Sequence, residues 1–413
     1  MKPITAIVLG AGSRGSTYAR YAKDFPGELQ IIAVAEPRED RRKLLAEELG
    51  VPEENRFASW QALLAKQRMA DCAFVCTLDD DHTEPAIRAM ELGYHLLLEK
   101  PMSNTEKECR LIADTARKTG RTLAVCHVLR YTPFYMTLKK LIDRGAVGQV
   151  EAINQIENVG YWHQAHSFVR GNWRTVRETS PMLLQKSCHD MDIILWLMGR
   201  DCKRVQSFGS LRHFTPEHAP QGAPERCLDG CPHAQSCPYY APRLYMDMTR
   251  TGWPVDVITT DLSEEGRRKA LEVGPYGRCV YHCDNDVVDH QVVNLLLEGG
   301  ATVNFTMCAF TKECARQIRI MGTRAEIIGD MEKNTIEVLP FVGENQLIDV
   351  STLTSDFSGH GGGDARMLED LLDLVAGGCT GGALTNISRS VESHLVALAA
   401  EESRLCGGKS IEL

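Results

Sequence analysis

The sequence of 413 residues has no run near the roughly 18 apolar residues that a membrane-spanning helix needs. It also has no excess of positive charge, because 55 Asp and Glu residues against 46 Lys and Arg residues give a net charge of −9. Neither a nucleic acid nor a membrane is therefore expected as a partner. Residues 1–4 lead directly into an apolar segment, so we expect no signal peptide and a cytoplasmic protein.

Cysteine is neither rare nor dense. Fifteen cysteines are many for an ordinary cytosolic enzyme and few for a disulfide scaffold of this length. Apolar residues make up 43% of the chain and charged residues 24%, which are globular values that exclude disorder, collagen and coiled coil. The length predicts two domains, or three.

The N-terminal third alternates short apolar segments with amphipathic helical segments. This alternation predicts a parallel sheet whose strands are joined by crossover helices. We expect a Rossmann domain, with a doubly wound parallel sheet, over residues 1–126. Its expected strands are 4–9, 29–35, 71–77, 95–98 and 123–126, and its expected helices are 13–25, 38–49, 82–92 and 104–118.

The first expected strand ends in a G-x-G-x-x-G turn that opens a helix. Such a turn allows pyrophosphate to approach the backbone and the helix N-terminus. Glu36 follows the second strand and is expected to bind the adenosine ribose, which favours NAD; the nearby Arg38 leaves NADP as an alternative. The residues of the turn expected at the cofactor are Gly10, Gly12, Ser13, Arg14 and Gly15.

Two further motifs follow later strands of this region, 77–82 (Thr-Leu-Asp-Asp-Asp-His) and Glu99-Lys100-Pro101. Together with the glycine turn, these motifs resemble those of the Gfo/Idh/MocA oxidoreductases, which act mainly on sugars, inositols and related polyols. The resemblance covers nearly the whole sequence. The resemblance implies that Lys100 lies beside the nicotinamide and the reacting alcohol, and that a cis peptide bond precedes Pro101. The further cofactor contacts expected are Thr77, Leu78, Asp79, His82, Glu99 and Lys100.

The resemblance also implies an α+β second domain, over residues 127–413, with a large, mostly antiparallel open sheet, and a homo-oligomer, either dimer or tetramer. Alternating segments agree with such a sheet, and the last five follow one another without helices, which predicts an antiparallel meander. Two helices are expected to close the chain, over residues 364–376 and 386–404. The expected strands are 149–156, 205–211, 289–297, 302–306, 317–322, 325–329 and 335–340.

The catalytic candidates of the second domain lie on one expected helix. His189 matches the family's histidine, and a neutral imidazole can accept an alcohol proton near pH 7. The Asp that the family pattern places four residues earlier is Gln185 here, so Lys186 or Asp190 is expected to supply the missing charge. The alternative is that His189 is a buried residue of the helix start.

Aromatic and hydrogen-bonding residues gather in the segment 161–174, as suits a sugar with apolar ring faces and hydroxyls. A structured surface loop with aromatic anchors is the alternative. His360 lies in a glycine-rich stretch similar to one in a family branch that hydrolyses glycosides with bound NAD, although this stretch also suits a helix entry capped by Asp364. The candidate substrate contacts are His127, Arg130, Tyr131, Trp162, His163, Trp173, Asp190 and His360.

Five cysteines fall in a Pro-rich insertion, at about 214–283, that has little regular pattern. Thiolates so grouped predict a structural zinc site or, second, an iron–sulfur site. Free or disulfide-bonded cysteines are the alternative. The candidate ligands are Cys227, Cys231, Cys237 and Cys279, with Cys283 as an alternative and His233 or His282 as a replacement.

Three functions follow from these residues. The first is an NAD-dependent oxidoreductase that transfers hydride between nicotinamide and a hydroxyl of a sugar, glycoside or cyclitol, with Lys100 and His189 as catalytic groups. The second is an NAD-dependent glycoside hydrolase that uses transient oxidation, elimination, hydration and re-reduction. The third is a nucleotide-binding regulator without catalysis.

Overall fold

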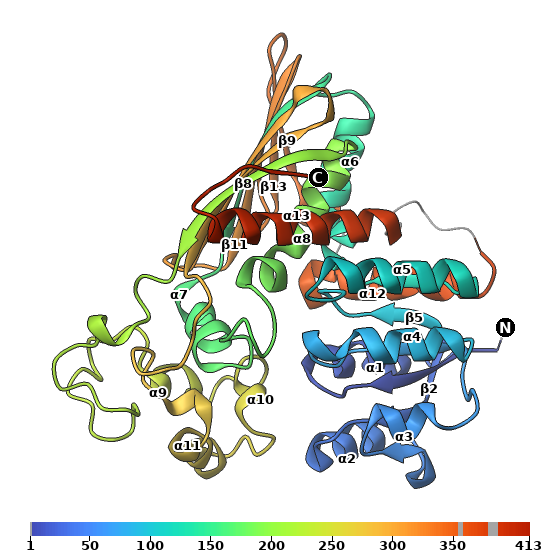
Figure 1. Cartoon of the computed structure of the whole chain (residues 1–413), viewed down its shortest axis with the longest axis vertical. Helices are drawn as coiled ribbons and strands as arrows, with labels where there is room; N and C mark the ends of the chain where they lie inside the picture. Colours follow the sequence, from blue (N-terminus) through green and yellow to red (C-terminus); the bar gives the residue numbers. More distant parts are fainter. Residues whose placement is uncertain (1, 354–357, 379–386) are drawn as a thin grey trace.

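The computed structural model describes residues 2–353, 358–378 and 387–413, with side chains for all of these except 358–360 (Figure 1). Two sheets organise the chain, one of six strands and one of nine. The predicted fold class is confirmed: a parallel Rossmann sheet comes first, and a mostly antiparallel sheet follows it. Within the described residues, no helix combines the length and the apolar character needed to cross a membrane.

The six-stranded sheet has the order β3-β2-β1-β4-β5-β6, and all of its pairings are parallel. Its central strands are buried over most of their length because helices cover both faces, as their continuous apolar sequences predict. The strands are β1 (Ile4–Leu9), β2 (Leu29–Ala35), β3 (Arg56–Phe57), β4 (Cys72–Val75), β5 (His95–Leu98) and β6 (Leu123–Val125), and the helices are α1 (Ser13–Asp24), α2 (Glu39–Glu48), α3 (Trp60–Leu64), α4 (Thr83–Glu91) and α5 (Glu106–Thr119).

The nine-stranded sheet has the order β14-β13-β12-β11-β7-β10-β9-β8-β15. Along β7, alternate side chains point into the core and to the outside, which is typical of a sheet covered on one face. Figure 1 shows this sheet rising above the first one. The strands are β7 (Val150–Asn158), β8 (Cys202–Ser210), β9 (His290–Leu297), β10 (Thr302–Cys308), β11 (Ala315–Gly322), β12 (Ala325–Asp330), β13 (Thr335–Pro340), β14 (Gln346–Asp349) and β15 (Ile411–Glu412).

The predicted meander is wrong at one point. β10 and β11 follow each other in the sequence, but β7 lies between them, parallel to β10 and antiparallel to β11. Each half is a meander, from β8 to β10 and from β11 to β14. The strand that joins them, β7, comes from far earlier in the chain, so no local sequence pattern indicates its position in the sheet.

Long helices connect the two sheets. α8 (Met182–Met198) and α13 (Ile387–Leu405) pack against each other, and both contribute to the core of the large sheet. α12 (Ser358–Val375) comes late in the chain but packs in the core of the nucleotide sheet, with Met367 and Leu371 beside Val8 and Phe74. α6 (Pro133–Asp143) begins directly after the nucleotide sheet, and its Thr132 cap accepts a hydrogen bond from the backbone N–H of Tyr135.

The insertion over residues 214–283 forms a separate lobe with short helices only (Figure 1). Two small apolar clusters form its interior, in place of one continuous core. Its helices are α9 (Ala241–Tyr245), α10 (Val255–Ile258) and α11 (Glu264–Val273).

Candidate active site

The glycine turn has the geometry that its sequence predicted. Gly10 has φ of +97°, and a Cβ on it would lie 2.4 Å from the carbonyl oxygen of Cys76. A Cβ on Gly15 would lie 1.9 Å from the carbonyl oxygen of Gly10, so only glycine lets α1 pack this close to β1. Above Gly12 the space is open except for one Arg41 nitrogen.

α1 begins at Ser13 without a side-chain cap and without an acidic residue in its first turn. Its N–H groups and the positive end of its dipole thus remain available to an anion. Glu36 lies buried at the end of β2, where its carboxylate accepts hydrogen bonds from the backbone N–H groups of Ala11 (2.8 Å) and Arg38 (2.9 Å). The open space over Gly12, the uncapped helix and this carboxylate fit a dinucleotide with a free ribose 2′-hydroxyl.

Glu99 ties the glycine turn to the strand that carries Lys100. Its carboxylate accepts hydrogen bonds from the Tyr18 hydroxyl (2.6 Å) and from Arg14 Nε (3.0 Å). Burial by itself raises the pKa of Glu99, but the charges of Arg14 and Lys100 outweigh it and hold this pKa below its ordinary value. Arg14 also pairs with Asp364 (2.6 Å), which lies inside α12 and not at the helix start where its sequence placed it.

Lys100 and His189 lie on facing elements. Lys100 follows β5, is joined to Pro101 by the expected cis peptide bond, and donates a hydrogen bond from Nζ to the backbone carbonyl of Gln185 (2.6 Å). α8 begins at Met182, so Gln185 and His189 are one helical turn apart on the same face of that helix. The ammonium group thus contacts the backbone of α8 one helical turn before His189.

His127 lies beside His189, and His394 lies beside His127. The ring of His127 is 6.2 Å from that of His189 and 5.6 Å from that of His394, measured between centroids. Burial lowers the pKa of His127 to about 4 and that of His394 to about 3, so both are neutral at pH 7. His394 accepts a hydrogen bond from the backbone N–H of Met102 (2.8 Å), next to Pro101.

Arg130 and Tyr131 are buried away from the solvent. Arg130 donates from Nε and Nη2 to the two carboxylate oxygens of Asp192, each at 2.6 Å. Asp192 is also 3.7 Å from Nε2 of His127. Because its donors are engaged in this bidentate pair, Arg130 holds the Asp192 carboxylate in place beside His127.

Lys186 and Asp190 belong to one buried network of charges. Lys186 Nζ is 3.1 Å from Glu157 Oε1, and Arg316 Nε is 2.9 Å from both Glu157 Oε2 and Asp190 Oδ1. Gln155 donates a further hydrogen bond to Asp190 (2.6 Å). Asp190 and Lys186 are therefore both engaged with internal partners of this network.

Aromatic rings form another part of the site. The rings of Trp162 and His163 are stacked 5.7 Å apart, and Trp253 from the insertion lies 5.4 Å from Trp162 and 5.0 Å from His163. Burial and the positive charge of Lys186, with a smaller contribution from Lys100, hold the pKa of His163 well below its ordinary value. The sequence pointed to Trp162 and His163 and missed Trp253, because nothing local links the insertion to residues 161–163.

The motif 77–82 makes internal contacts. Asp79 accepts hydrogen bonds from Trp173 Nε1 (3.3 Å) and Ser180 Oγ (2.7 Å), so it joins the nucleotide sheet to the loop before α8. His82 lies 2.7 Å from the carbonyl oxygen of Pro101 and fixes that turn, while Leu78 is exposed. The sequence also missed His394, which reaches Met102 from the far end of the chain. The side chain of His360 lies outside the described residues.

The predicted zinc site is not supported. Within the described residues, which include all five cysteines of the insertion, no three His, Cys, Asp or Glu side chains are placed to share one metal ion. The five are free thiols in this structure, and so are the other described cysteines. The spacing in the sequence brings several of these cysteines together without placing their sulfurs at one point.

Comparison with known proteins agrees with this geometry. An oxidoreductase NAD-binding Rossmann fold matches residues 4–127, and the C-terminal alpha/beta domain of the same oxidoreductases matches residues 139–404. These matches define an NAD-binding oxidoreductase. The chain belongs to the Gfo/Idh/MocA family, which confirms the resemblance seen in its motifs.

Several characterised and uncharacterised relatives share part of the sequence. YteT of Bacillus subtilis is 25% identical over 316 residues, which cover 73% of this chain and 72% of YteT. A 2,7-anhydro-N-acetylneuraminate hydratase of Mediterraneibacter gnavus is 27% identical over 48% of this chain and 50% of its own length. An inositol 2-dehydrogenase of Klebsiella pneumoniae is 27% identical over 48% of this chain and 56% of its own. The matches to the last two thus span about half of each relative.

Solved structures share the fold over the whole chain. An inositol dehydrogenase homolog of Azotobacter vinelandii complexed with NAD+ aligns with a TM-score of 0.71 at 16% identity, over 100% of this chain and 98% of that one. The WlbA dehydrogenase of Chromobacterium violaceum, in complex with NADH and UDP-GlcNAcA, aligns with a TM-score of 0.72 at 16% identity, over 100% and 96%. At this identity, the likeness establishes the fold.

Proposed function

We propose that the protein is an NAD-dependent oxidoreductase that acts on a hydroxyl of a sugar, glycoside or cyclitol. The single observation that carries this proposal is the hydrogen bond of 2.6 Å from Lys100 Nζ to the carbonyl of Gln185, one helical turn from His189. It brings a cationic donor and an imidazole to the end of β5, at the carboxyl edge of the nucleotide sheet, where ligands of such sheets bind.

In this proposal Lys100 donates a hydrogen bond to the reacting oxygen of the substrate and stabilises its developing negative charge. His189 accepts the proton of the hydroxyl. NAD, when bound over the glycine turn, supplies the hydride acceptor. Glu99 keeps Lys100 in place from the other side, because it accepts a hydrogen bond from the Lys100 backbone N–H (2.8 Å).

A carbohydrate is favoured by the side chains around this pair. Trp162 offers an aromatic face, and the neutral His163 offers a ring nitrogen that can donate or accept a hydrogen bond. Relatives and structural neighbours named for an inositol dehydrogenase and for a UDP-GlcNAcA complex agree with this class. Glu36 favours NAD over NADP, because its carboxylate would repel a 2′-phosphate.

The test is a panel of sugars, cyclitols and aryl glycosides with NAD, followed at once for reduced cofactor and for released aglycone. Lys100→Ala should lower kcat/KM by about 100- to 1,000-fold, the cost of one oxyanion donor, and leave NAD affinity unchanged. Lys140→Ala, at an exposed position of α6, is the control. Unaltered turnover by Lys100→Ala contradicts the role of Lys100, and no turnover with any substrate favours a non-catalytic regulator.

A second candidate is an NAD-dependent glycoside hydrolase, in which each catalytic cycle returns the cofactor to its starting oxidation state. One observation favours it. Elimination and hydration require a further general acid or base, and His163 is a neutral imidazole whose pKa is influenced by the charge of Lys100. The hydratase relative agrees with chemistry of this kind. Release of aglycone without net NADH supports this candidate, and stoichiometric NADH supports the first.

We also propose a homo-oligomer built on the outer face of the large sheet. Apolar side chains on this sheet are exposed to solvent in the single chain, among them Ile156, Phe208, Leu296 and Ile328. Such a patch is typical of a surface that another subunit covers. Light scattering coupled to size exclusion tests this, and a monomer at micromolar concentration contradicts it.

A further inference from the structure

The segment 253–260 of the insertion begins at the aromatic group of the candidate active site. The ring of Trp253 lies 5.4 Å from that of Trp162 and 5.0 Å from that of His163, measured between centroids. His163 is close enough to Lys100 for the ammonium charge to contribute to the lowering of its pKa. The start of this segment therefore lies on the side of the site where Lys100 ends β5.

The other end of the segment contacts the nucleotide domain. The carbonyl of Val257, in α10, accepts a hydrogen bond from Arg41 Nη2 (3.4 Å), and Thr260 Oγ1 donates to Asp40 Oδ2 (3.4 Å). Asp40 and Arg41 belong to the start of α2, shortly after Glu36. Both hydrogen bonds are long, so they keep the segment near α2 without holding it firmly.

These two ends correspond to the two ends of a bound dinucleotide. β2, which leads to Glu36, and β5, which leads to Lys100, lie on opposite sides of β1 in the sheet. A dinucleotide bound at the glycine turn after β1 extends from one position towards the other. Figure 1 shows α10 on the side of the lobe that faces the nucleotide sheet. The segment 253–260 therefore lies across the cofactor site from the sheet.

Arg41 lies where the dinucleotide carries its negative charge. Its Nη1 is 3.8 Å from the point that a Cβ on Gly12 would occupy, and pyrophosphate approaches the backbone at this glycine. Among the described residues, no carboxylate lies within ion-pair distance of Arg41. Burial and the positive charge of Arg38 lower the pKa of Arg41, and the charges of Glu36 and Asp40 offset this in part. An anion over Gly12 would supply the missing counter-charge.

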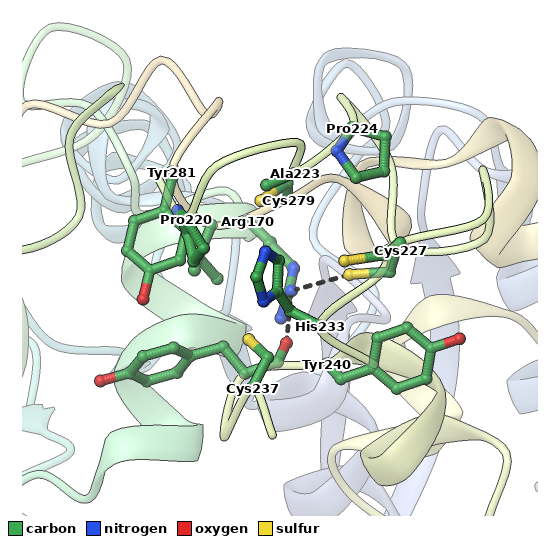
Figure 2. Close-up of a pocket in the computed structure, with 13 residues that line it drawn as sticks. Arg170, Pro220, Ala223, Pro224, Cys227, His233, Cys237, Tyr240, Cys279 and Tyr281 are labelled. Atoms are coloured by element: carbon green, nitrogen blue, oxygen red, sulfur yellow. Dashed lines mark hydrogen bonds between the residues drawn. The ribbon is translucent and has the colours of Figure 1, made fainter. Parts of the chain in front are cut away.

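The lobe that carries the segment is fixed beside the candidate active site. Arg170, which is 2% exposed, donates hydrogen bonds to the carbonyls of Arg278 and Tyr239 in the lobe, both at 2.7 Å. Figure 2 shows its guanidinium at a cavity of the lobe that four cysteines also line. Arg170 ends the helical segment Gln164–Arg170, which begins directly after His163. The lobe and the aromatic group are thus joined, and together they support the segment 253–260.

We propose that Arg41 binds the pyrophosphate of NAD, and that the segment 253–260 covers the bound cofactor and slows its release. Arg41 links the two, because its guanidinium has several N–H donors and can meet the pyrophosphate and the Val257 carbonyl together. The affinity comes from Arg41 on the nucleotide domain, whereas the segment sets how fast the cofactor enters and leaves. The proposal rests on NAD binding at the glycine turn and not on the substrate or the reaction.

The first experiment measures ligand binding to the full chain by titration calorimetry. Arg41→Gln should weaken the binding of NAD and of ADP-ribose alike, by about tenfold, the value of one charged hydrogen bond, and leave the binding of adenosine unchanged. Lys43→Gln is the control, because Lys43 is an exposed cation of the same helix. Equal losses for adenosine and ADP-ribose, a loss confined to NADP, or equal effects of the two variants would overturn the role of Arg41.

The second experiment tests the cover by hydrogen exchange of the unmodified chain. Backbone N–H groups of residues 253–260 should exchange more slowly when NAD is bound, because the cofactor lies against them. Those of α11, elsewhere in the same lobe, should not change. No added protection at 253–260, or equal protection of α11, overturns the cover, and so does a chain that does not bind NAD.

The third experiment measures the rate at which NADH leaves, by its fluorescence after rapid mixing. Trp253→Ala removes the anchor of the segment, so NADH should leave about fivefold faster, the value of one aromatic contact. Phe341→Ala, at an exposed aromatic residue after β13, is the control, and circular dichroism shows whether each variant is folded. An unchanged release rate in folded Trp253→Ala contradicts the cover. None of these readouts uses a substrate, so they are independent of the proposed function.

Discussion

The nucleotide sheet and the insertion are stabilised in different ways. In the sheet, β4 and the last four residues of β1 are fully buried, and the two strands pair with each other over these residues. In the insertion, arginine side chains bind the backbone carbonyls that no regular structure satisfies. Arg267, which is 1% exposed, donates to the carbonyls of Leu262, Tyr245, Asp247 and Arg250 at 2.8–3.2 Å.

Other arginines of the lobe act in the same way. Arg226 donates to the carbonyls of Leu271 and Gly274, and Arg243 to those of Ala234, Gln235 and Cys237. Buried carbonyls need partners in any fold, and a segment without strands must obtain them from side chains. Irregular structure thus depends on a few residues, whereas a sheet spreads the same requirement over many.

The largest effect should follow from removing one such arginine. Arg267→Met removes the side-chain donor of four carbonyls of the insertion, and we expect a loss of about 4 kcal/mol in the stability of the lobe. NAD affinity should stay the same, because the nucleotide sheet is independent of this contact. Denaturant unfolding and hydrogen exchange measure both. Arg268→Met is the control, since Arg268 is exposed and pairs with the exposed Glu264. Equal effects would show that the carbonyl contacts are unimportant.

The corresponding change in the sheet domain acts through steric overlap and not through the loss of hydrogen bonds. Gly15→Ala places a Cβ against the carbonyl oxygen of Gly10, so we expect about 3 kcal/mol of destabilisation and weaker NAD binding. Gly27→Ala, with no atom within 4 Å of its Cβ, is the matched control. Urea unfolding and an NAD titration check the result. A Gly15→Ala protein as stable as the control would contradict the tight packing of α1.

A pH series compares how well the two regions exclude water. Burial lowers the pKa of His166, which contacts Tyr245 of the insertion, to about 3, and that of His394 at the nucleotide domain to about 3. The unfolded chain binds protons below pH 6.5 and the folded chain does not, so stability should fall between pH 6.5 and 4. Each histidine contributes about 1.4 kcal/mol per pH unit.

His166→Phe should therefore reduce the slope of the unfolding free energy against pH by about 1.4 kcal/mol per unit. His218→Gln, at the exposed edge of the insertion, is the control. Guanidinium unfolding at about pH 4.5, 5.5 and 6.5 gives the slope of the unfolding free energy against pH. If His166→Phe keeps the slope of the unmodified protein, the insertion admits water where the sheet domain does not.

The smallest effect concerns cofactor choice. Glu36→Gln keeps an acceptor for the Ala11 N–H but removes the charge, so the affinity for NADP relative to NAD should rise about fivefold, or about 1 kcal/mol. Glu39→Gln, an exposed change in the first turn of α2, is the control. Titration with both cofactors measures the ratio. A ratio that shifts equally in both variants would remove Glu36 from the choice of cofactor.

The sequence predicted the nucleotide domain well for a physical reason. Its strands are buried on both faces, so they appear as short continuous apolar segments between amphipathic helices, and the glycines at positions 10 and 15 have no substitute. The strands of the large sheet were also visible, because their side chains alternate. The place of β7 between β10 and β11 was not, since strand order depends on contacts between distant segments.

The same distinction between local patterns and distant contacts applies to the candidate site. Motifs pointed to Lys100 and His189, but the partners of neighbouring residues depend on other elements. Asp190 is bound by Arg316 from β11, and Trp253 reaches His163 from the insertion. The family pattern suggested a charge near position 185, and what Lys100 meets there is a backbone carbonyl, which every residue type carries.

By itself the sequence determined the elements, the cofactor turn and the family, because these depend on local periodicity and on residues that a conformation requires. Only the tertiary structure decided which side chains face one another: α12 on the nucleotide sheet, His394 beside Met102, and four cysteines around one cavity. Contacts between residues far apart in the chain arise from the packing of whole elements, and no local pattern records where those elements meet.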